Sequence, residues 1–499
     1  MFAELKKTLR QTAIYSLGNL TSKVIGFILL PLYTDYLSVS EYGIFAILEA
    51  TSQILIGIFG FNFTTSMMRW CVSEKSADGQ KKIISSTFFA TFIIAVIFSL
   101  ITIPFKTELS ELILSTPKFE NYITILLLSV SFGILSNVPL EVIRFREKPS
   151  FYVFLNISKF VVIVLLNVYF IVYAKLGVEG IILSQLIGFI YLIIASFPFM
   201  LKNMNFSFSA KIIGEMFRFG FPLVFSTSAL LALSLGDRYI IKYFMDEASV
   251  GVYSLGNKIA SVINVFILQS FQVGYLPLAY KKINDENAPR YFSKVTTYLV
   301  FILMISALSL SIFGREIVKT FSLKTEYWDA YNVIPYISLA FVFRGMQYVF
   351  SLPFHFVKKT SYIAYVVVAA AVLNIAFNII YISKYGYIAA GVVMLASYIF
   401  MTIVYYFSAK KHFFIPFEIT KLFKMLFVGI ILYSISLLVD NAHVLLRLPV
   451  KVILFLLFPF ILYYMNFYEK VELERIKGAY LKWKNPSHWK ENFKKMKLL

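Results

Sequence analysis

Four positively charged side chains fall inside stretches that are apolar enough to cross a membrane, and they are Lys23, Lys159, Lys258 and Arg344. A charge at the bilayer centre costs about 2.5 to 3.5 kcal/mol on insertion scales, so such a residue usually faces a cavity or a partner. Fixed cations can replace the water around an anion, with the arginine suited to bidentate contact and the lysines acting as point charges. The four residues therefore predict a cavity for a negatively charged group. Each of them could instead form an intramembrane ion pair or snorkel toward the membrane surface.

Acidic residues inside the apolar stretches are fewer than the cations. Glu49 is a candidate for coupling transport to H⁺ or Na⁺, and a static ion pair with Lys23 or Lys258 is the alternative. Asp237 is a second ion-coupling candidate, and its neighbour Arg238 also suggests a pair at the mouth of the cavity. The four histidines are scattered along the chain, so we predict no metal site, no resident cofactor and no catalytic residues.

Neutral polar residues add a second set of candidate ligands in the same stretches. Asn19, Gln53 and Asn257 could bind hydroxyl groups of a saccharide, or could hold neighbouring helices together, which is worth about 0.6 kcal/mol for each residue. The first, second, seventh and eighth apolar stretches carry an unusual share of such residues and are predicted to form the cavity walls. In the seventh, Pro222 is interpreted as an ordinary residue near a helix N-terminus, with a hinge as the alternative.

These residues must be positioned by membrane-spanning helices. Of the 499 residues, 59% are hydrophobic, and the mean hydropathy of +0.76 exceeds what a soluble core could bury. A spanning helix needs roughly 20 apolar residues. The expected all-α polytopic membrane protein has about 14 spans: 12–33, 43–67, 83–104, 122–142, 151–173, 180–200, 219–244, 250–276, 295–313, 333–354, 362–382, 387–407, 422–439 and 444–465.

Lysine and arginine collect in alternate loops. About 32 of the 47 lie on one side of the predicted spans, about 11 on the other and 4 within them. Cytoplasmic loops hold the excess of such residues, so both termini are predicted to be cytoplasmic. The net charge of +20 therefore indicates membrane topology and no nucleic-acid partner.

The sequence contains an internal repeat. Tyr42-Gly43 recurs as Val250-Gly251 about 208 residues later, and the segment 145–180 recurs as 356–391. An even number of spans for each copy makes the copies parallel, with a substrate site expected between them. We predict two pseudo-two-fold related six-helix lobes (1–205 and 206–412), an additional helix pair (413–466) and a basic cytoplasmic tail (467–499).

The runs Gly18 to Lys23, Pro31-Leu32 and Tyr42 to Phe45, with the turns at 167–180 and 378–391, closely resemble polysaccharide flippases of the multidrug/oligosaccharidyl-lipid/polysaccharide exporter (MOP) superfamily. The resemblance covers about residues 5–410. It implies two lobes that open alternately to each side of a bacterial cytoplasmic membrane. The implied cargo is an O-antigen-type, polyprenyl-diphosphate-linked oligosaccharide for surface polysaccharide biosynthesis. Membrane lipids, a polysaccharide polymerase and glycosyltransferases are the other implied partners.

Two other functions stay open at this point. A cation-coupled multidrug exporter of the same superfamily is the first, but exporters of cationic drugs should have an acidic cavity, whereas cations predominate here. A membrane enzyme of polysaccharide assembly, a polymerase or ligase, is the second. Such an enzyme usually carries a large external loop with catalytic residues, and the predicted loops reach only about 15 to 17 residues.

Overall fold

The computed structural model describes residues 27–357, 359–474 and 477–478. Within these ranges the chain is helical and has no strand, and 13 helices are long and apolar enough to cross a membrane. These 13 match the second to fourteenth predicted spans, so the predicted fold class is confirmed. The predicted first span is described only from residue 27 onward.

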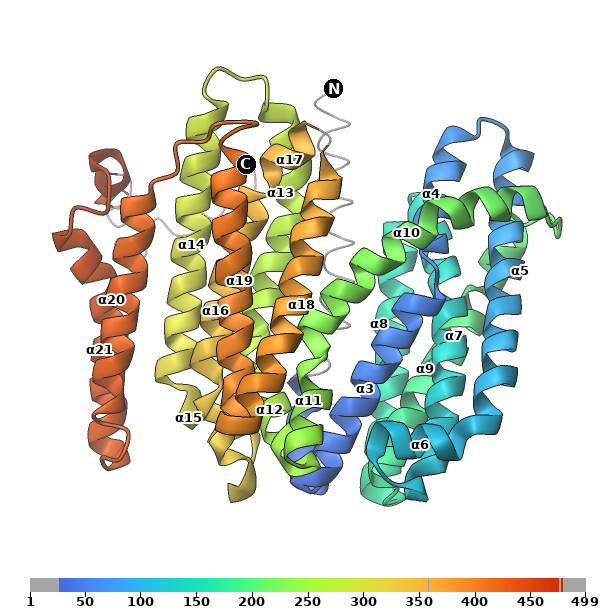
Figure 1. The fold of residues 1–499 in the computed structure, drawn as a ribbon, viewed down its shortest axis with the longest axis horizontal. Coiled ribbons are helices and arrows are strands. Elements are labelled where there is room, and N and C mark those ends of the chain that lie inside the picture. The colour runs from blue at the N-terminus through green and yellow to red at the C-terminus, as the bar shows by residue number, and fades with distance from the viewer. Residues whose placement is uncertain (1–26, 358, 475–476, 479–499) are drawn as a thin grey trace, which may run out of the picture.

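The helices form two groups with an additional pair beside the second (Figure 1). The first group contains α2 (Leu30–Tyr36), α3 (Val39–Phe59), α4 (Phe63–Ser73), α5 (Ala77–Thr102), η1 (Ile103–Phe105), α6 (Lys106–Leu114), η2 (Pro117–Phe119), α7 (Glu120–Phe145), α8 (Pro149–Val168), η3 (Tyr169–Tyr173) and α9 (Gly177–Asn203).

The second group contains α10 (Ala210–Leu235), which runs obliquely between the groups, followed by α11 (Asp237–Phe244), α12 (Glu247–Ala260), η4 (Ile263–Leu268), α13 (Gln269–Lys282), α14 (Ala288–Ile312), α15 (Gly314–Phe321), η5 (Thr325–Asn332), α16 (Ile334–Phe350), α17 (Leu352–Phe356), α18 (Thr360–Tyr385) and α19 (Tyr387–Ala409). The additional pair is α20 (Ile419–Leu437) and α21 (Val444–Tyr464).

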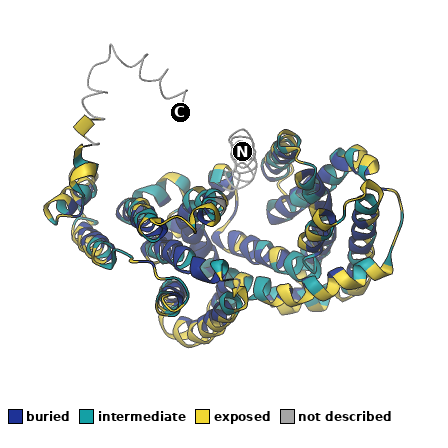
Figure 2. Ribbon diagram, turned by 90° about the horizontal axis from the view of Figure 1, so that it is seen from above, coloured by how far each residue is buried: buried dark blue, intermediate teal, exposed yellow. Residues whose placement is uncertain are grey.

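Apolar side chains form both the interior and the outward faces of the bundle. Leu303, Val342 and Ile337 are fully buried, whereas Leu100 and Ile194 are largely exposed. Figure 2 shows the corresponding pattern, in which exposed residues follow the outer faces of the helices. Hydrocarbon tails are as apolar as these side chains, so an exposed apolar surface of this kind fits a membrane-embedded protein.

The two groups meet where α3 crosses α12, and the repeat is visible in that contact. A Cβ atom on Gly43 would lie 1.8 Å from the carbonyl oxygen of Glu247, and one on Gly251 would lie 2.2 Å from that of Val39. Both pairs are related by the same shift of about 208 residues. Only glycine permits this backbone approach, so each copy of the repeat supplies one glycine to a pseudo-symmetric crossing.

Several predicted spans depart from regular helices, among them the second and the seventh. The second is interrupted between α3 and α4, where Phe61 and Asn62 have φ of 45° and 50°. The seventh begins at Ala210, and Pro222 lies inside α10. The interpretation of Pro222 as a residue near a helix N-terminus is therefore wrong, because the helix extends well before the apolar stretch begins. The Ser66 hydroxyl donates to the Met216 carbonyl at 3.2 Å, so α10 packs beside the interruption.

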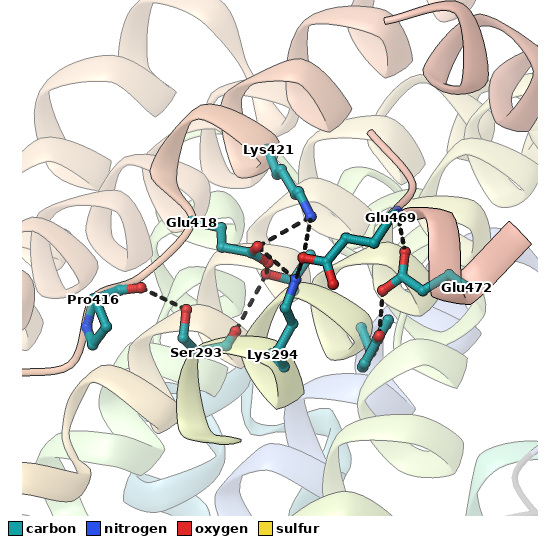
Figure 3. A network of polar contacts seen from close by, with 9 residues as sticks. Ser293, Lys294, Pro416, Glu418, Lys421, Glu469 and Glu472 are labelled. Atoms are coloured by element: carbon teal, nitrogen blue, oxygen red, sulfur yellow. Dashed lines mark hydrogen bonds and ion pairs between the residues drawn. The ribbon is translucent and has the colours of Figure 1, made fainter. Parts of the chain in front are cut away.

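Charged clusters attach the additional pair to the second group at both of its ends. In the first cluster, Lys294 of α14 contacts Glu418 at 2.7 Å and also pairs with Glu469 (Figure 3). Glu418 directly precedes α20, and Glu469 follows α21. In the second, Lys451 of α21 contacts Glu316 of α15 at 3.1 Å and Asp440 at 2.6 Å. The pair is therefore held to α14 and α15 by ionic contacts at both ends.

Candidate functional site

A cavity of about 370 Å³ lies where the two groups of helices face each other. Its walls come from α2, α3, α8 and α9 of the first group and from α12 and η4 of the second. Its polar lining residues are Tyr33, Glu49, Gln53, Asn156, Lys159, Gln185, Lys258 and Ser261. The structure thus brings together four of the sequence-predicted site residues, Glu49, Gln53, Lys159 and Lys258.

Lys159 projects from α8 into this cavity. Its ammonium nitrogen lies 3.9 Å from the centre of the Phe189 ring of α9, and no carboxylate in the described part of the chain forms an ion pair with it. The face of an aromatic ring attracts a cation but does not neutralise it. Lys159 therefore keeps a positive charge that an anionic ligand could approach.

Glu49 and Lys258 face each other across the cavity from different lobes. The Lys258 ammonium nitrogen lies 3.7 Å from the Glu49 carboxylate, and the two side chains are 29% and 34% exposed. The static ion pair that the sequence left open as an alternative for Glu49 is therefore present in this conformation. Two lysines against one glutamate leave the described lining with an excess of positive charge.

Neutral donors and aromatic rings complete the wall. The amides of Gln53 and Gln185 form no hydrogen bond with another described residue, so both are available to a ligand. Asn156 donates to the Tyr152 carbonyl at 2.8 Å, which fixes its amide within α8. The rings of Phe27, Tyr33, Phe45 and Phe160 supply an apolar surface beside these polar groups. Such a lining can bind an anion together with hydroxyl-rich and ring-shaped groups.

Five of the nine predicted site residues are absent from the described lining of this cavity. Lys23 and Asn19 lie outside the described residues. Arg344 belongs to α16 and is absent from the described lining, and its guanidinium carbon lies 5.6 Å from the Tyr398 ring of α19. The structure therefore places Arg344 against another helix of its own lobe.

Asp237 and Asn257 form part of a buried network at the junction of α11 and α12. Asp237 is 3.1 Å from the Arg238 guanidinium and accepts a hydrogen bond from the Tyr253 hydroxyl. Asn257 donates to the same hydroxyl at 3.4 Å. Asp237 is 3% exposed and already paired, so in this conformation it ties two helices together and does not line the cavity.

Sequence reasoning did not single out Ser261 or the aromatic lining residues. Helical spacing could have indicated them, because residues three or four apart lie on the same face of a helix. Phe45 precedes Glu49 by one turn, and Ser261 follows Lys258 by one turn. Asn167 also has a role that the sequence did not indicate, since it accepts a hydrogen bond from Tyr33 at 3.2 Å and so connects α8 with α2.

Comparison with known proteins agrees with this architecture. The family described as "Polysaccharide biosynthesis protein" matches residues 8–281, which is more than half of the chain. The chain belongs to this family. The MatE family also matches, over residues 222–380, and the two families together indicate the MOP superfamily. As a member of the polysaccharide biosynthesis protein family, the chain is a multi-pass membrane protein with a transporter fold.

Curated relatives of this family member include two proteins of Haemophilus influenzae. An uncharacterized membrane protein is 21% identical over 285 residues, covering 56% of this chain and 66% of the relative. A protein of the Lsg locus is 23% identical over 290 residues, covering 56% of this chain and 68% of the relative. The chain thus spans about two thirds of the length of each relative.

Solved structures share the fold of this family member. The lipid II flippase MurJ in an inward closed conformation gives a TM-score of 0.74 at 17% identity, covering 91% of this chain and 100% of MurJ. An inward-facing multidrug resistance MATE transporter of the MOP superfamily gives 0.65 at 14% identity, covering 81% and 97%. At these identities the likeness concerns the fold.

Proposed function

We propose that this protein is a flippase that carries a polyprenyl-diphosphate-linked oligosaccharide across the bacterial cytoplasmic membrane by alternating access. The observation that carries the proposal is the cavity between the lobes, where Lys159 has no acidic partner among the described residues and Lys258 has only one. A diphosphate needs fixed cations to replace its water, and the saccharide needs amides and rings of the kind that line the same wall. The polysaccharide biosynthesis family and the MurJ-like fold support this choice.

Two features support a conformation that is closed toward the outside. Lys81 and Lys82 lie in the first turns of α5 and Lys281 and Lys282 in the last turn of α13, next to the α4–α5 and α13–α14 loops. Both loops lie at one end of the bundle, at the top of Figure 1. By the positive-inside rule this end is cytoplasmic. The α3–α12 crossing, where the lobes touch, lies toward the opposite end, together with α6 and α15. Cargo would therefore enter from the cytoplasm in this state.

Charge distinguishes this proposal from a multidrug exporter of the same superfamily. An exporter of cationic drugs is expected to place more acid than base in its cavity, whereas the described lining holds two lysines and Glu49. The proposed cargo is therefore anionic, and the proposed mechanism involves transport without chemical conversion of the cargo.

Translocation of a fluorescent polyprenyl diphosphate oligosaccharide in proteoliposomes tests the proposal. Replacing Lys159 or Lys258 with glutamate is expected to abolish translocation while the protein still inserts and purifies normally. Lys384→Glu, at an exposed position of α18 outside the cavity, is the matched control and should retain transport. Wild-type translocation rates in both cavity variants would contradict the proposal. So would transport of cationic dyes in place of the lipid-linked oligosaccharide.

A further inference from the structure

Two hydrogen bonds between the lobes occupy equivalent positions of the internal repeat. The Thr34 hydroxyl donates to the carbonyl of Phe321 at 2.5 Å, and the Lys242 ammonium donates to the carbonyl of Ile113 at 3.3 Å. Lys242 follows Thr34 by the repeat interval of about 208 residues, and Phe321 follows Ile113 by the same interval. The two contacts are therefore pseudo-symmetric counterparts, as are the contacts of Gly43 and Gly251.

Each contact joins a short helix of one lobe to a short helix of the other, because Thr34 lies in α2 and Lys242 in α11. Ile113 lies in α6, which connects α5 with α7, and Phe321 lies in α15, which connects α14 with α16. Both short helices lie at the end of the bundle where the lobes touch (Figure 1). Their last carbonyl groups have no partner within the helix and carry the negative end of the helix dipole, so they are suitable acceptors for donors from the other lobe.

The second-lobe linker makes more contacts with the opposite lobe than the first-lobe linker does. On the second-lobe side, the Lys324 ammonium also donates to the Leu37 carbonyl at 2.6 Å, and the Tyr327 hydroxyl donates to the Ser38 carbonyl at 3.1 Å. Leu37 is the C-cap residue of α2, so Lys324 places a positive charge at a helix C-terminus. The Tyr327 ring also contacts the ring of Tyr42 edge-on, with their centres 5.9 Å apart.

The first-lobe linker lacks these additional donors at the matching positions. Thr116 stands where the second lobe has Lys324, and its hydroxyl accepts from the Lys118 amide in the same linker. Phe119 stands where the second lobe has Tyr327, and it stacks on Tyr122 of its own lobe. Lys242 is itself shared with Glu247, 3.3 Å away. The closed end is thus fastened mainly from the second lobe.

We propose that the linker of residues 314–332 is the principal latch of the outer gate, with Lys324 and Tyr327 as its main fasteners and the Lys242 contact as a weaker counterpart. The inference rests on the proposed alternating-access function. Opening toward this end separates the linker from the Leu37–Ser38 turn, and water then solvates the freed carbonyls. The strength of the latch sets how often the empty protein opens outward.

Cysteine accessibility tests this assignment without any cargo. In a Cys71→Ala background, which removes the single native cysteine, Ser261→Cys places a reporter in the cavity wall. A membrane-impermeant maleimide is supplied from the side where α6 and α15 lie. We expect Lys324→Gln to raise the labelling rate about tenfold. The substitution removes a hydrogen bond from a charged donor that only the closed state makes, so it destabilises the closed state relative to the open one. Tyr327→Phe should raise it less, and Lys242→Gln least.

Lys118→Gln is the matched control, since Lys118 is an exposed lysine in the first-lobe linker. Unchanged labelling in both Lys324→Gln and Tyr327→Phe, an equal rise in Lys118→Gln, or a larger rise in Lys242→Gln would overturn the latch. A rise in labelling from this side should be matched by a fall from the opposite side, which separates gate opening from unfolding. Failure of the proposed cargo assignment would leave these labelling rates unaffected.

Discussion

Glu49 of α3 and Lys258 of α12 form an ion pair across the cavity, with the carboxylate oxygen and the ammonium nitrogen 3.7 Å apart. The pair joins the two lobes at the position where an anionic cargo is proposed to bind. A carboxylate that neutralises a cargo-binding cation must be displaced when cargo arrives. The pair therefore connects cargo binding with the contact between the lobes.

Replacing Glu49 with glutamine is expected to free Lys258 and to weaken the dependence of transport on an ion gradient. The pair is about one-third exposed, so its loss should change stability by less than about 1 kcal/mol. Transport driven by a proton or sodium gradient, compared with transport without one, is the measurement. Gradient dependence equal to that of the wild type would make Glu49 a structural residue.

Lys159 offers a test of charge against shape. Lys159→Arg keeps the charge, whereas Lys159→Gln removes it. A charge-assisted hydrogen bond is worth about 1.5 to 3 kcal/mol, so cargo affinity should fall roughly 10-fold to 100-fold in the glutamine variant. The arginine variant should stay close to wild type. Equal losses in the two variants, measured by cargo binding, would indicate that Lys159 acts through packing.

The glycine crossing predicts a severe effect from a single methyl group. A Cβ on Gly251 would lie 2.2 Å from the Val39 carbonyl, so Gly251→Ala should force α3 and α12 apart and disfavour the closed state. Gly274→Ala is the matched control, because nothing lies within 4 Å of a Cβ at that position. We expect transport to fall at least about tenfold in the first variant only. Similar rates for the two variants would show that the crossing tolerates separation.

The buried cluster at Lys451 should contribute strongly to stability. Lys451 is 1% exposed and pairs with both Glu316 and Asp440, which are each 17% exposed. Lys451→Met leaves these largely shielded carboxylates with less compensation, since Arg447 then pairs with Glu316 alone. Breaking a buried pair in this way costs about 3 to 5 kcal/mol. Thermal unfolding in detergent is the measurement, with Lys384→Met as the exposed control. An unchanged midpoint would show that water already reaches the cluster.

Acid should loosen the other tether of the additional helix pair, which Figure 3 shows. Burial alone would raise the pKa of Glu418, but hydrogen bonds from Lys294, Thr297 and Lys421 outweigh it and lower that pKa. The hydrogen bond from Lys294 is also the main cause that lowers the pKa of Glu469. A lowered pKa means that the stabilisation is complete above the ordinary pKa of a glutamate and is lost as pH falls through the lowered value.

The pH dependence can be measured as the unfolding midpoint between neutral pH and the acid range below the usual pKa of a glutamate. The double variant Glu418→Gln, Glu469→Gln should have a lower unfolding midpoint than the wild type at neutral pH. Its midpoint should also fall less on acidification. Parallel curves for the two proteins would mean that other carboxylates control acid sensitivity.

Much of the fold could be predicted because it depends on periodic and compositional signals. Apolar stretches of spanning length predicted every described span, and the recurrence of Gly43 as Gly251 predicted the two related lobes. The interruption at Phe61 and Asn62 was missed: asparagine is enriched in the left-handed region, but one asparagine in an apolar run can equally be a polar contact between helices. The start of α10 at Ala210 was missed because its first turns are too polar to resemble a membrane span.

The candidate site was only partly predictable. A charge within an apolar stretch shows that some partner or cavity exists, and it does not show which helix the side chain faces. Lys159 and Lys258 line the cavity, whereas Arg344 lies beside Tyr398 within one lobe and Asp237 is paired with Arg238. These outcomes depend on the rotation of each helix about its axis, which tertiary packing determines.

The central claim is that lysines held between the lobes replace the water around a negatively charged cargo. Its most direct test compares the binding of a polyprenyl diphosphate oligosaccharide with that of the same lipid-linked saccharide lacking the diphosphate, in the wild type and in Lys159→Gln, Lys258→Gln. The account predicts a strong preference of the wild type for the charged lipid and little preference in the double variant. Equal binding of the two lipids by the wild type, or an unchanged preference in the double variant, would contradict it.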